Sequence, residues 1–249
     1  MWTAMRDVVT ASFPPAPGLP SSPEAYTKAV EENYANDAYN SLSIEGYRVS
    51  LELIERVRSG NWNPDSNCGD RQDRDTLAAR GYYLAFQEVR ATIESLILGE
   101  SVGQVRQAHR DWYRALFGPS VEVGILKASD LAGYRNHPVF ISGSRYVPPT
   151  SDSVVDGMHT LFDLLEIESE ASVRAVLGHF IFVYIHPYPD GNGRIGRFLM
   201  NAMLASGGYP WTVIKLENRP TYMHALASAS IGGDIEPFSR FIASELPTA

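Results

Sequence analysis

One stretch of twelve residues concentrates the side chains that could do chemistry, His-Pro-Tyr-Pro-Asp-Gly-Asn-Gly-Arg-Ile-Gly-Arg at residues 186–197. Gly191 and Gly193 allow backbone angles and close approaches that a Cβ would block, so amide groups in this turn can point at a bound anion. The chain then enters a helix near Arg194, whose free amides and positive dipole end attract negative charge. These features predict a phosphate-binding turn.

Polar side chains after the turn extend this phosphate site along one helical face. Arg194, Arg197 and Asn201 follow one another at i, i+3 and i+7, so two guanidiniums can hold successive phosphates and an amide can lie beyond them. Asp190 stands beside the turn, and Mg²⁺ characteristically takes one or two carboxylate oxygens together with phosphate oxygens. The pattern favours a triphosphate, with Mg²⁺ held by Asp190.

His186 lies between a long apolar run and this turn. An imidazole has an unperturbed pKa of about 6.5 and can take a hydroxyl proton near neutral pH. His186 is therefore the candidate general base. His109 and His179 lie inside helical runs with apolar neighbours, and we interpret both as packing residues.

Residues 186–197 resemble the defining motif of the Fic family, His-Pro-Phe/Tyr-x-Asp/Glu-Gly-Asn-Gly-Arg-x-x-Arg, at every constrained position. Eight of these positions allow one residue or nearly one, so a chance match has a frequency on the order of 10⁻¹⁰ per starting point. The likeness extends from Ser41 to about Ala243. It implies a mainly α fold, a Fic-like helical bundle with one short β-hairpin called the flap.

The resemblance implies an enzyme that transfers AMP from ATP to a Tyr, Ser or Thr hydroxyl of a target protein. In the family's pattern His186 deprotonates that hydroxyl, Asp190 holds Mg²⁺ and Arg197 grips the terminal phosphate. Asn192 and the neighbouring amides stabilise charge on the α-phosphate, which makes Asn192 a third catalytic residue. The nucleotide-binding residues implied are Gly191, Asn192, Gly193, Arg194, Arg197, Asn201 and Tyr222.

Between Gly133 and Pro149 the pattern changes to that of a hairpin, with apolar runs at 139–141 and 146–147 around Gly143-Ser144. In the Fic family such a flap is thought to hold the target segment as an added strand through backbone hydrogen bonds. The target-binding residues that the resemblance implies are Val139, Phe140, Ile141, Ser142, Gly143 and Ser144.

A second short pattern, Ser41-Leu42-Ser43-Ile44-Glu45-Gly46, is similar to the family's inhibitory pattern Ser/Thr-x-x-x-Glu-Gly/Asn, which lies on a helix before the core in one class. A carboxylate of Glu45 paired with Arg197 would occupy the guanidinium meant for the γ-phosphate. Ser41 lies one turn earlier on the same helical face. The resemblance implies autoinhibition by Ser41, Glu45 and Gly46, whereas the plainer interpretation is an exposed glutamate at a helix end.

Two other kinds of function stay open on these residues. Some relatives remove AMP, using the inhibitory glutamate to orient water, and a few transfer other phosphate-containing groups. The other alternative is an ATP-sensing regulatory module without turnover, acting through the helix at 24–46. The presence of both His186 and Asp190 argues against such a silent module.

The elements that must position these residues are mostly helices. Ser22 followed by Pro23 predicts a helix start, and Gly46 predicts its end. Apolar residues at helical spacing predict further helices at about 50–59, 73–98, 103–117, 152–165, 171–185, 194–206, 219–230 and 236–245. We expect an N-terminal arm at 1–22, an inhibitory segment at 23–48 and a catalytic domain at 49–249, the last two forming one compact unit.

Composition limits the choice of partners. The net charge of −8 disfavours binding to nucleic acid. Residues 1–22 have no continuous apolar run after a basic start, which argues against a signal peptide or membrane anchor. The single Cys68 cannot form an internal disulfide, so a reducing, cytoplasmic location is expected. The sequence leaves open whether the chain forms a homo-oligomer.

Overall fold

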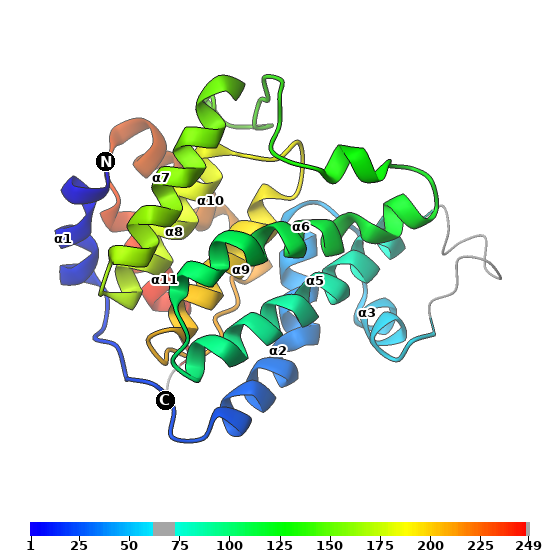
Figure 1. Cartoon of the computed structure of the whole chain (residues 1–249), viewed down its shortest axis with the longest axis horizontal. Helices are drawn as coiled ribbons and strands as arrows, with labels where there is room; N and C mark the ends of the chain where they lie inside the picture. The colour runs from blue at the N-terminus through cyan, green and yellow to red at the C-terminus, as the bar shows by residue number, and fades with distance from the viewer. Residues whose placement is uncertain (62–72, 248–249) are drawn as a thin grey trace.

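The structure is a computed structural model that describes residues 1–61 and 73–247, so Cys68 lies outside the described residues. Within these ranges the chain is built from helices joined by loops and short 3₁₀ turns (Figure 1). The helices are α1 (Trp2–Ser12), α2 (Pro23–Ile44), α3 (Leu51–Arg58), α5 (Arg74–Ile97), α6 (Val105–Glu122), α7 (Val154–Ile167), α8 (Ala171–Ile185), α9 (Asn192–Ala205), α10 (Arg219–Gly232) and α11 (Glu236–Glu245).

Helices α8 and α9 form the centre of the bundle. Most side chains of α8 are buried, in keeping with a sequence that is apolar around most of its circumference, and nearly all of those of α9 are buried too. α7 covers α8, whereas the adjacent pair α5 and α6 packs against α9 (Figure 1). Gly196 allows the close approach of α8 and α9, because a Cβ there would lie 2.9 Å from Val183 Cγ1. The loop joining α8 to α9 is therefore anchored at both ends by buried helices.

Helix α2 packs against α3 and α5 and ends beside the start of α9. Its predicted start is confirmed, because Ser22 Oγ accepts a hydrogen bond from the amide of Ala25 at 3.2 Å. Its predicted end is confirmed as well, since Gly46 follows with a φ of +85°. Buried polar groups need partners, and the buried polar side chains of α2 are Asp37, Asn40 and Ser41.

The predicted β-hairpin is absent, so this part of the predicted fold class was wrong: no residue in 1–61 or 73–247 lies in a strand. Residues 137–149 form a loop, which we call the 137–149 loop, with one turn closed where Ser144 donates to the carbonyl of Ile141 at 3.0 Å. Phe140 is 79% exposed, so its side chain has no core face to bury. An isolated two-stranded ribbon is only marginally stable in water, and prolines at both ends of this segment lack amide donors.

A helix that the sequence did not suggest, α1, lies within the segment interpreted as an arm and packs against α8 and α11 (Figure 1). Trp2, Met5 and Val9 are its buried side chains. Arg6 holds Glu168 through two hydrogen bonds of 2.8 and 2.9 Å. α1 thus covers the beginning of α8. None of the described helices is long and apolar enough to cross a membrane.

Candidate active site

His186 caps the C-terminal end of α8 in a left-handed conformation, with φ 53° and ψ 60°. Among the residues that the structure describes, it is the one non-glycine residue with a positive φ. Such a conformation costs on the order of 1–3 kcal/mol and persists only where neighbours enforce it. The His186 amide donates to the carbonyl of Phe182 at 3.0 Å, and its own carbonyl accepts from Arg135 Nε at 2.7 Å. The chain is thereby turned sharply out of the core at the candidate base.

The imidazole of His186 is oriented by a bond between Nδ1 and the carbonyl of Val183 at 3.2 Å. A carbonyl only accepts, so Nδ1 carries the proton and Nε2 keeps a free lone pair in the neutral ring. Burial lowers the pKa of His186, and the charge of Arg135 lowers it further. The ring therefore stays neutral at neutral pH, as a general base requires.

The turn before α9 has the geometry of an anion site. Gly191 precedes α9 with a φ of +82°, and a Cβ there would lie 2.9 Å from the ring of Phe117. The amide of Ile195 donates to the carbonyl of Gly191 at 3.0 Å and closes the first helical turn. The amides at 192–194 precede that bond and point out of the helix end, where the dipole is positive. They are the donors that an anion would meet.

Asn192 has a role that its type alone did not reveal. Its Oδ1 accepts from the amide of Tyr188 at 2.9 Å, and its Nδ2 donates to the carbonyl of Tyr188 at 2.7 Å. The Tyr188 ring in turn stacks on Tyr113, with centroids 3.7 Å apart and planes at 6°. The Asn192 side chain is 2% exposed and closes the loop as a clamp. In this conformation both polar atoms of the Asn192 side chain are engaged with Tyr188.

Asp190 and Arg194 form an ion pair of 3.2 Å at the rim of the turn. The carboxylate also accepts from the amide of Gly191 at 2.6 Å. The Asp190 side chain is 59% exposed, whereas that of Arg194 is 1% exposed and lies 5.0 Å from the ring centroid of Tyr47 and 5.2 Å from that of Phe117. Asp190 is thus open to a cation, and Arg194 sits between two aromatic rings.

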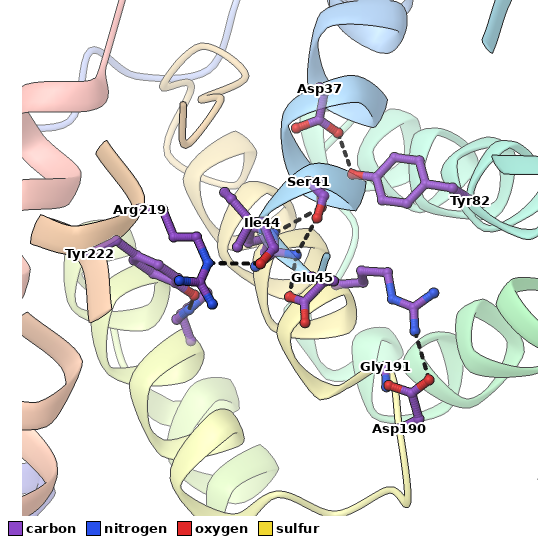
Figure 2. Close-up of polar contacts among 12 residues, drawn as sticks. Asp37, Ser41, Ile44, Glu45, Tyr82, Asp190, Gly191, Arg219 and Tyr222 are labelled. Atoms are coloured by element: carbon purple, nitrogen blue, oxygen red, sulfur yellow. Dashed lines mark hydrogen bonds and ion pairs between the residues drawn. The ribbon is translucent and has the colours of Figure 1, made fainter. Parts of the chain in front are cut away.

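Arg197 is bound by the end of α2, whose Ser41 and Glu45 are labelled in Figure 2. Its Nε donates to Ser41 Oγ at 2.8 Å, and its Nη2 donates to the Ser41 carbonyl at 3.1 Å and to Glu45 Oε1 at 2.7 Å. Burial is the largest single effect on Arg197 and opposes its charge, yet the charges of Glu45, Tyr222 and Tyr82 and the hydrogen bond to Glu45 together raise the pKa of Arg197. The structure therefore brings together Ser41, Glu45 and Arg197, which are far apart in the sequence.

Glu45 also covers the beginning of α9. A Cβ built on Gly193 would collide with Glu45 Oε1, so the carboxylate lies directly against this glycine. The last turn of α2 is held from the other side, because Arg219 at the start of α10 donates to the carbonyl of Ile44 at 2.9 Å (Figure 2). An arginine in this place is favoured by the negative end of the helix dipole. The carboxylate of Glu45 thus occupies the predicted phosphate site.

One more acidic group lies on this side of α2. Asp37 accepts a hydrogen bond of 2.6 Å from the hydroxyl of Tyr82 on α5 and is 3% exposed (Figure 2). Burial raises the pKa of Asp37 to about 6, against the opposing effects of Tyr82, Trp211 and Arg197. The sequence did not single out this residue, although an aspartate one turn before Ser41 was a visible signal.

Two residues expected to contact the nucleotide are engaged with other partners. Asn201 donates to the carbonyl of Thr212 at 3.0 Å and accepts from its amide at 2.8 Å. The hydroxyl of Tyr222 lies 2.8 Å from Nε2 of His179. Both side chains are buried, so each would have to exchange these bonds to reach a ligand.

Residues 139–144 lie on the surface, joined to the His186 region by a buried residue that the sequence did not indicate, Arg135. Phe140 and residues 142–144 are exposed. Arg135 bonds to the carbonyl of His137 at 3.0 Å and to that of Pro149 at 2.6 Å, as well as to His186. Its neighbours in the sequence, Tyr134 and Asn136, gave no signal of this role.

The sequence is similar to those of known proteins. Residues 100–204 match the model of the Fic/DOC family. The chain is 30% identical over 223 residues to a protein named protein adenylyltransferase Fic from Drosophila willistoni, covering 88% of this chain and 41% of that protein. It is 28% identical over 233 residues to a protein of the same name from Nematostella vectensis, covering 90% and 50%. The chain spans half or less of the length of these relatives.

Solved structures with a similar fold include Fic-1 from C. elegans, with a TM-score of 0.69 at 20% identity, covering 98% of this chain and 68% of that one. A Fic-domain-containing signalling protein from Bacteroides thetaiotaomicron also gives a TM-score of 0.69, at 19% identity, covering 98% and 91%. These likenesses concern the fold. The family match shows that residues 100–204 form a Fic/DOC domain, in agreement with the similarity to the named relatives.

Proposed function

We propose that this chain is a protein adenylyltransferase that transfers the AMP part of ATP to a hydroxyl side chain of a target protein. The observation that carries the proposal is the convergence of three groups at one loop. These are a neutral imidazole with a free nitrogen, the open N-terminus of α9, and a buried guanidinium held by a carboxylate. The similarity to proteins named adenylyltransferases supports the same activity.

In the proposed reaction, Nε2 of His186 accepts the proton of the target hydroxyl while its oxygen attacks the α-phosphorus of ATP. The bond from the α-phosphorus to the oxygen bridging the β-phosphate breaks, and pyrophosphate leaves with that electron pair. The amides at 192–194, with Arg194 and Arg197, neutralise the phosphate charge. Phosphoryl-type transfer depends mainly on such positioning and neutralisation.

Asp190 is the residue that would hold Mg²⁺. No group of three or more His, Cys, Asp or Glu side chains that could hold a metal occurs in residues 1–61 and 73–247. A single exposed carboxylate beside a phosphate site is nonetheless a fit for Mg²⁺, which commonly shares its coordination between one or two carboxylates and substrate phosphates. When bound, the ion would offset the negative charge of the phosphates.

We further propose that α2 inhibits the enzyme through Glu45. The γ-phosphate and the Glu45 carboxylate would both pair with Arg197, and both would lie above Gly193. Ser41 adds two bonds to the same guanidinium. Gly46 ends α2 immediately after Glu45 and so fixes where the carboxylate lies. A productively bound triphosphate therefore requires Glu45 to withdraw.

Residues 139–144 are proposed to contact the target protein as part of the 137–149 loop. Most of them are exposed, and the loop is tied through Arg135 to the carbonyl of His186. A target segment lying along this loop would have its hydroxyl near the base. The bound target segment is expected to contribute contacts that the 137–149 loop lacks on its own.

Removal of AMP from a modified protein is the second candidate activity. The observation that favours it is the position of Glu45, whose carboxylate lies against Gly193 at the phosphate turn and is 26% exposed. A carboxylate in that place could orient a water molecule toward a bound phosphate ester. In this alternative Glu45 is required for activity, whereas in the transferase it is inhibitory.

The decisive experiment uses the Glu45→Gly chain with ATP labelled on the α-phosphate, Mg²⁺ and a cell lysate. A transferase labels protein with this variant more strongly than with the wild-type chain, and His186→Ala in the same background abolishes labelling. Mass spectrometry of the labelled protein then identifies the target and the acceptor residue. ATP binding without labelling would reject the transferase in favour of a sensor, and loss of AMP from labelled protein only when Glu45 is present would favour removal.

A further inference from the structure

Arg135 is a buried arginine whose side chain donates four hydrogen bonds, each to a backbone carbonyl. It is 4% exposed. Its Nε donates to the carbonyl of His186 at 2.7 Å, and its Nη2 donates to that of Ile185 at 3.3 Å. Its other bonds run to the carbonyls of His137 at 3.0 Å and Pro149 at 2.6 Å. The Arg135 amide also donates to the carbonyl of Pro187 at 2.8 Å.

Through one side chain, these bonds join three segments of the chain. The first is the end of α8, where the carbonyls of Ile185 and His186 lie at the negative end of the helix dipole. The other two are the beginning and the end of the 137–149 loop. A guanidinium is planar and presents five donors in a fixed fork, so it fixes the relative orientation of the carbonyls it binds. A lysine has one compact ammonium and cannot bind all three segments in this geometry.

His186 is the residue most affected by this arrangement. Its left-handed backbone is unfavourable by itself, and Arg135 bonds to the carbonyls of both His186 and its predecessor and, through its amide, to that of its successor. A change in the φ or ψ of His186 would swing the imidazole, since the ring follows its own Cα. The same guanidinium holds both ends of the loop next to that ring.

We propose that Arg135 is a positioning residue that fixes the His186 imidazole relative to the 137–149 loop. This inference rests on the proposed function, in which His186 is the base and the loop contacts the target. Arg135 then sets the distance between the base and the incoming hydroxyl without touching either substrate. Its effect should fall on kcat, because ATP is bound by the other side of the site, at α9.

The test compares Arg135→Lys and Arg135→Ala in the Glu45→Gly chain, with Arg174→Ala as the matched control. Arg174 is also a buried arginine that bonds backbone carbonyls, those of Glu168 and Ser169, but it lies at the start of α8, whereas His186 follows the end of that helix. For each variant we would measure kcat and the KM for ATP, the melting temperature, and the pKa of His186 from its ring proton resonance. Guanidinium chloride at millimolar concentration is added to Arg135→Ala as a chemical rescue.

For both Arg135 variants we expect kcat to fall by about 100-fold, the size expected when a reacting group moves by about 1 Å. The KM for ATP should stay within about threefold of the parent. Because the charge of Arg135 lowers the pKa of His186, that pKa should rise in Arg135→Ala and stay near the parent value in Arg135→Lys. Added guanidinium should restore part of kcat in Arg135→Ala. Arg174→Ala should lower the melting temperature with an unchanged kcat.

The proposal is overturned if kcat stays at the parent value in Arg135→Lys, or if kcat falls only as far as in Arg174→Ala with an unchanged His186 resonance. If Arg135→Ala does not fold, Arg135→Lys decides between these results. If the Glu45→Gly parent itself shows no transfer, the proposed function has failed. The His186 resonance still tests the positioning role in that case, because a displaced ring changes its chemical shift without any substrate.

Discussion

Replacing Glu45 by glutamine measures how strongly α2 holds Arg197. Glutamine keeps the length of the side chain and one acceptor oxygen but removes the charge. The bond is 2.7 Å long, and the two side chains are 3% and 26% exposed, so the pair is largely shielded from water. Hydrogen bonds between charged groups contribute about 1.5–3 kcal/mol. A loss of about 2 kcal/mol would raise the fraction of chains with a free Arg197, and with it the apparent affinity for ATP, about 30-fold.

The assay is calorimetric titration with a non-hydrolysable ATP analogue and Mg²⁺, with the rate of AMP transfer followed in parallel. Glu168→Gln is the control, because it weakens a comparable 2.8 Å ion pair with Arg6, which lies beside the start of α8 and not at the Glu45–Arg197 pair. It should lower the melting temperature and leave ATP binding unchanged. If the dissociation constant of Glu45→Gln stays within about threefold of the wild-type value, Glu45 does not compete with the triphosphate for Arg197.

Three further outcomes can be checked. Burial raises the folded-state pKa of Asp37 from 3.8 to about 6, so the stability that the protonated carboxyl contributes is present below about pH 4 and is lost as the pH rises through about 6. In urea unfolding, the free energy of unfolding of Asp37→Asn should therefore rise relative to that of the wild-type chain by up to about 3 kcal/mol from pH 4 to 7.5. A difference between the two chains that does not change with pH would contradict this. Because burial lowers the pKa of His186, the acidic limb of the kcat/KM profile should have its midpoint below about 6.5, and a midpoint above that value would argue against His186 as the base. Asn192→Ala should cost about 1–3 kcal/mol in unfolding free energy by removing both bonds to the Tyr188 backbone, whereas an unchanged free energy would show that the stacked Tyr188 ring holds the loop alone.

Most helices could be predicted because their signals are local. Ser22 acts within one turn of α2, and the apolar run of α8 is enough to place that helix in the core. The sequence did not predict α1, because its buried face is short and because Glu168, which bonds to Arg6, lies far along the chain. The prediction of a β-hairpin was wrong for the opposite reason. Its local pattern was adequate, but the bundle offers Phe140 no surface on which to bury a strand.

In the site, too, local features could be predicted from the sequence and distant contacts could not. The turn at 186–197 could be interpreted from residue type and spacing, since its glycines and arginines act within two helical turns. The contact of Ser41 and Glu45 with Arg197 joins residues more than 150 positions apart, so only the resemblance to a family suggested it. Residue type could not reveal that Asn201 bonds to Thr212 instead of facing a ligand, because that choice depends on tertiary packing.

The absence of a side chain at Gly193 matters in both states proposed for the site. Glu45 can rest on α9 only because no Cβ stands there, and a phosphate entering the same space would need the same clearance. A substitution at Gly193 would therefore displace Glu45 and, in the proposed function, obstruct the phosphate as well. Genetic screens for constitutively active chains should for this reason recover changes in α2, at Glu45 or Ser41, and not in the glycine on which they rest.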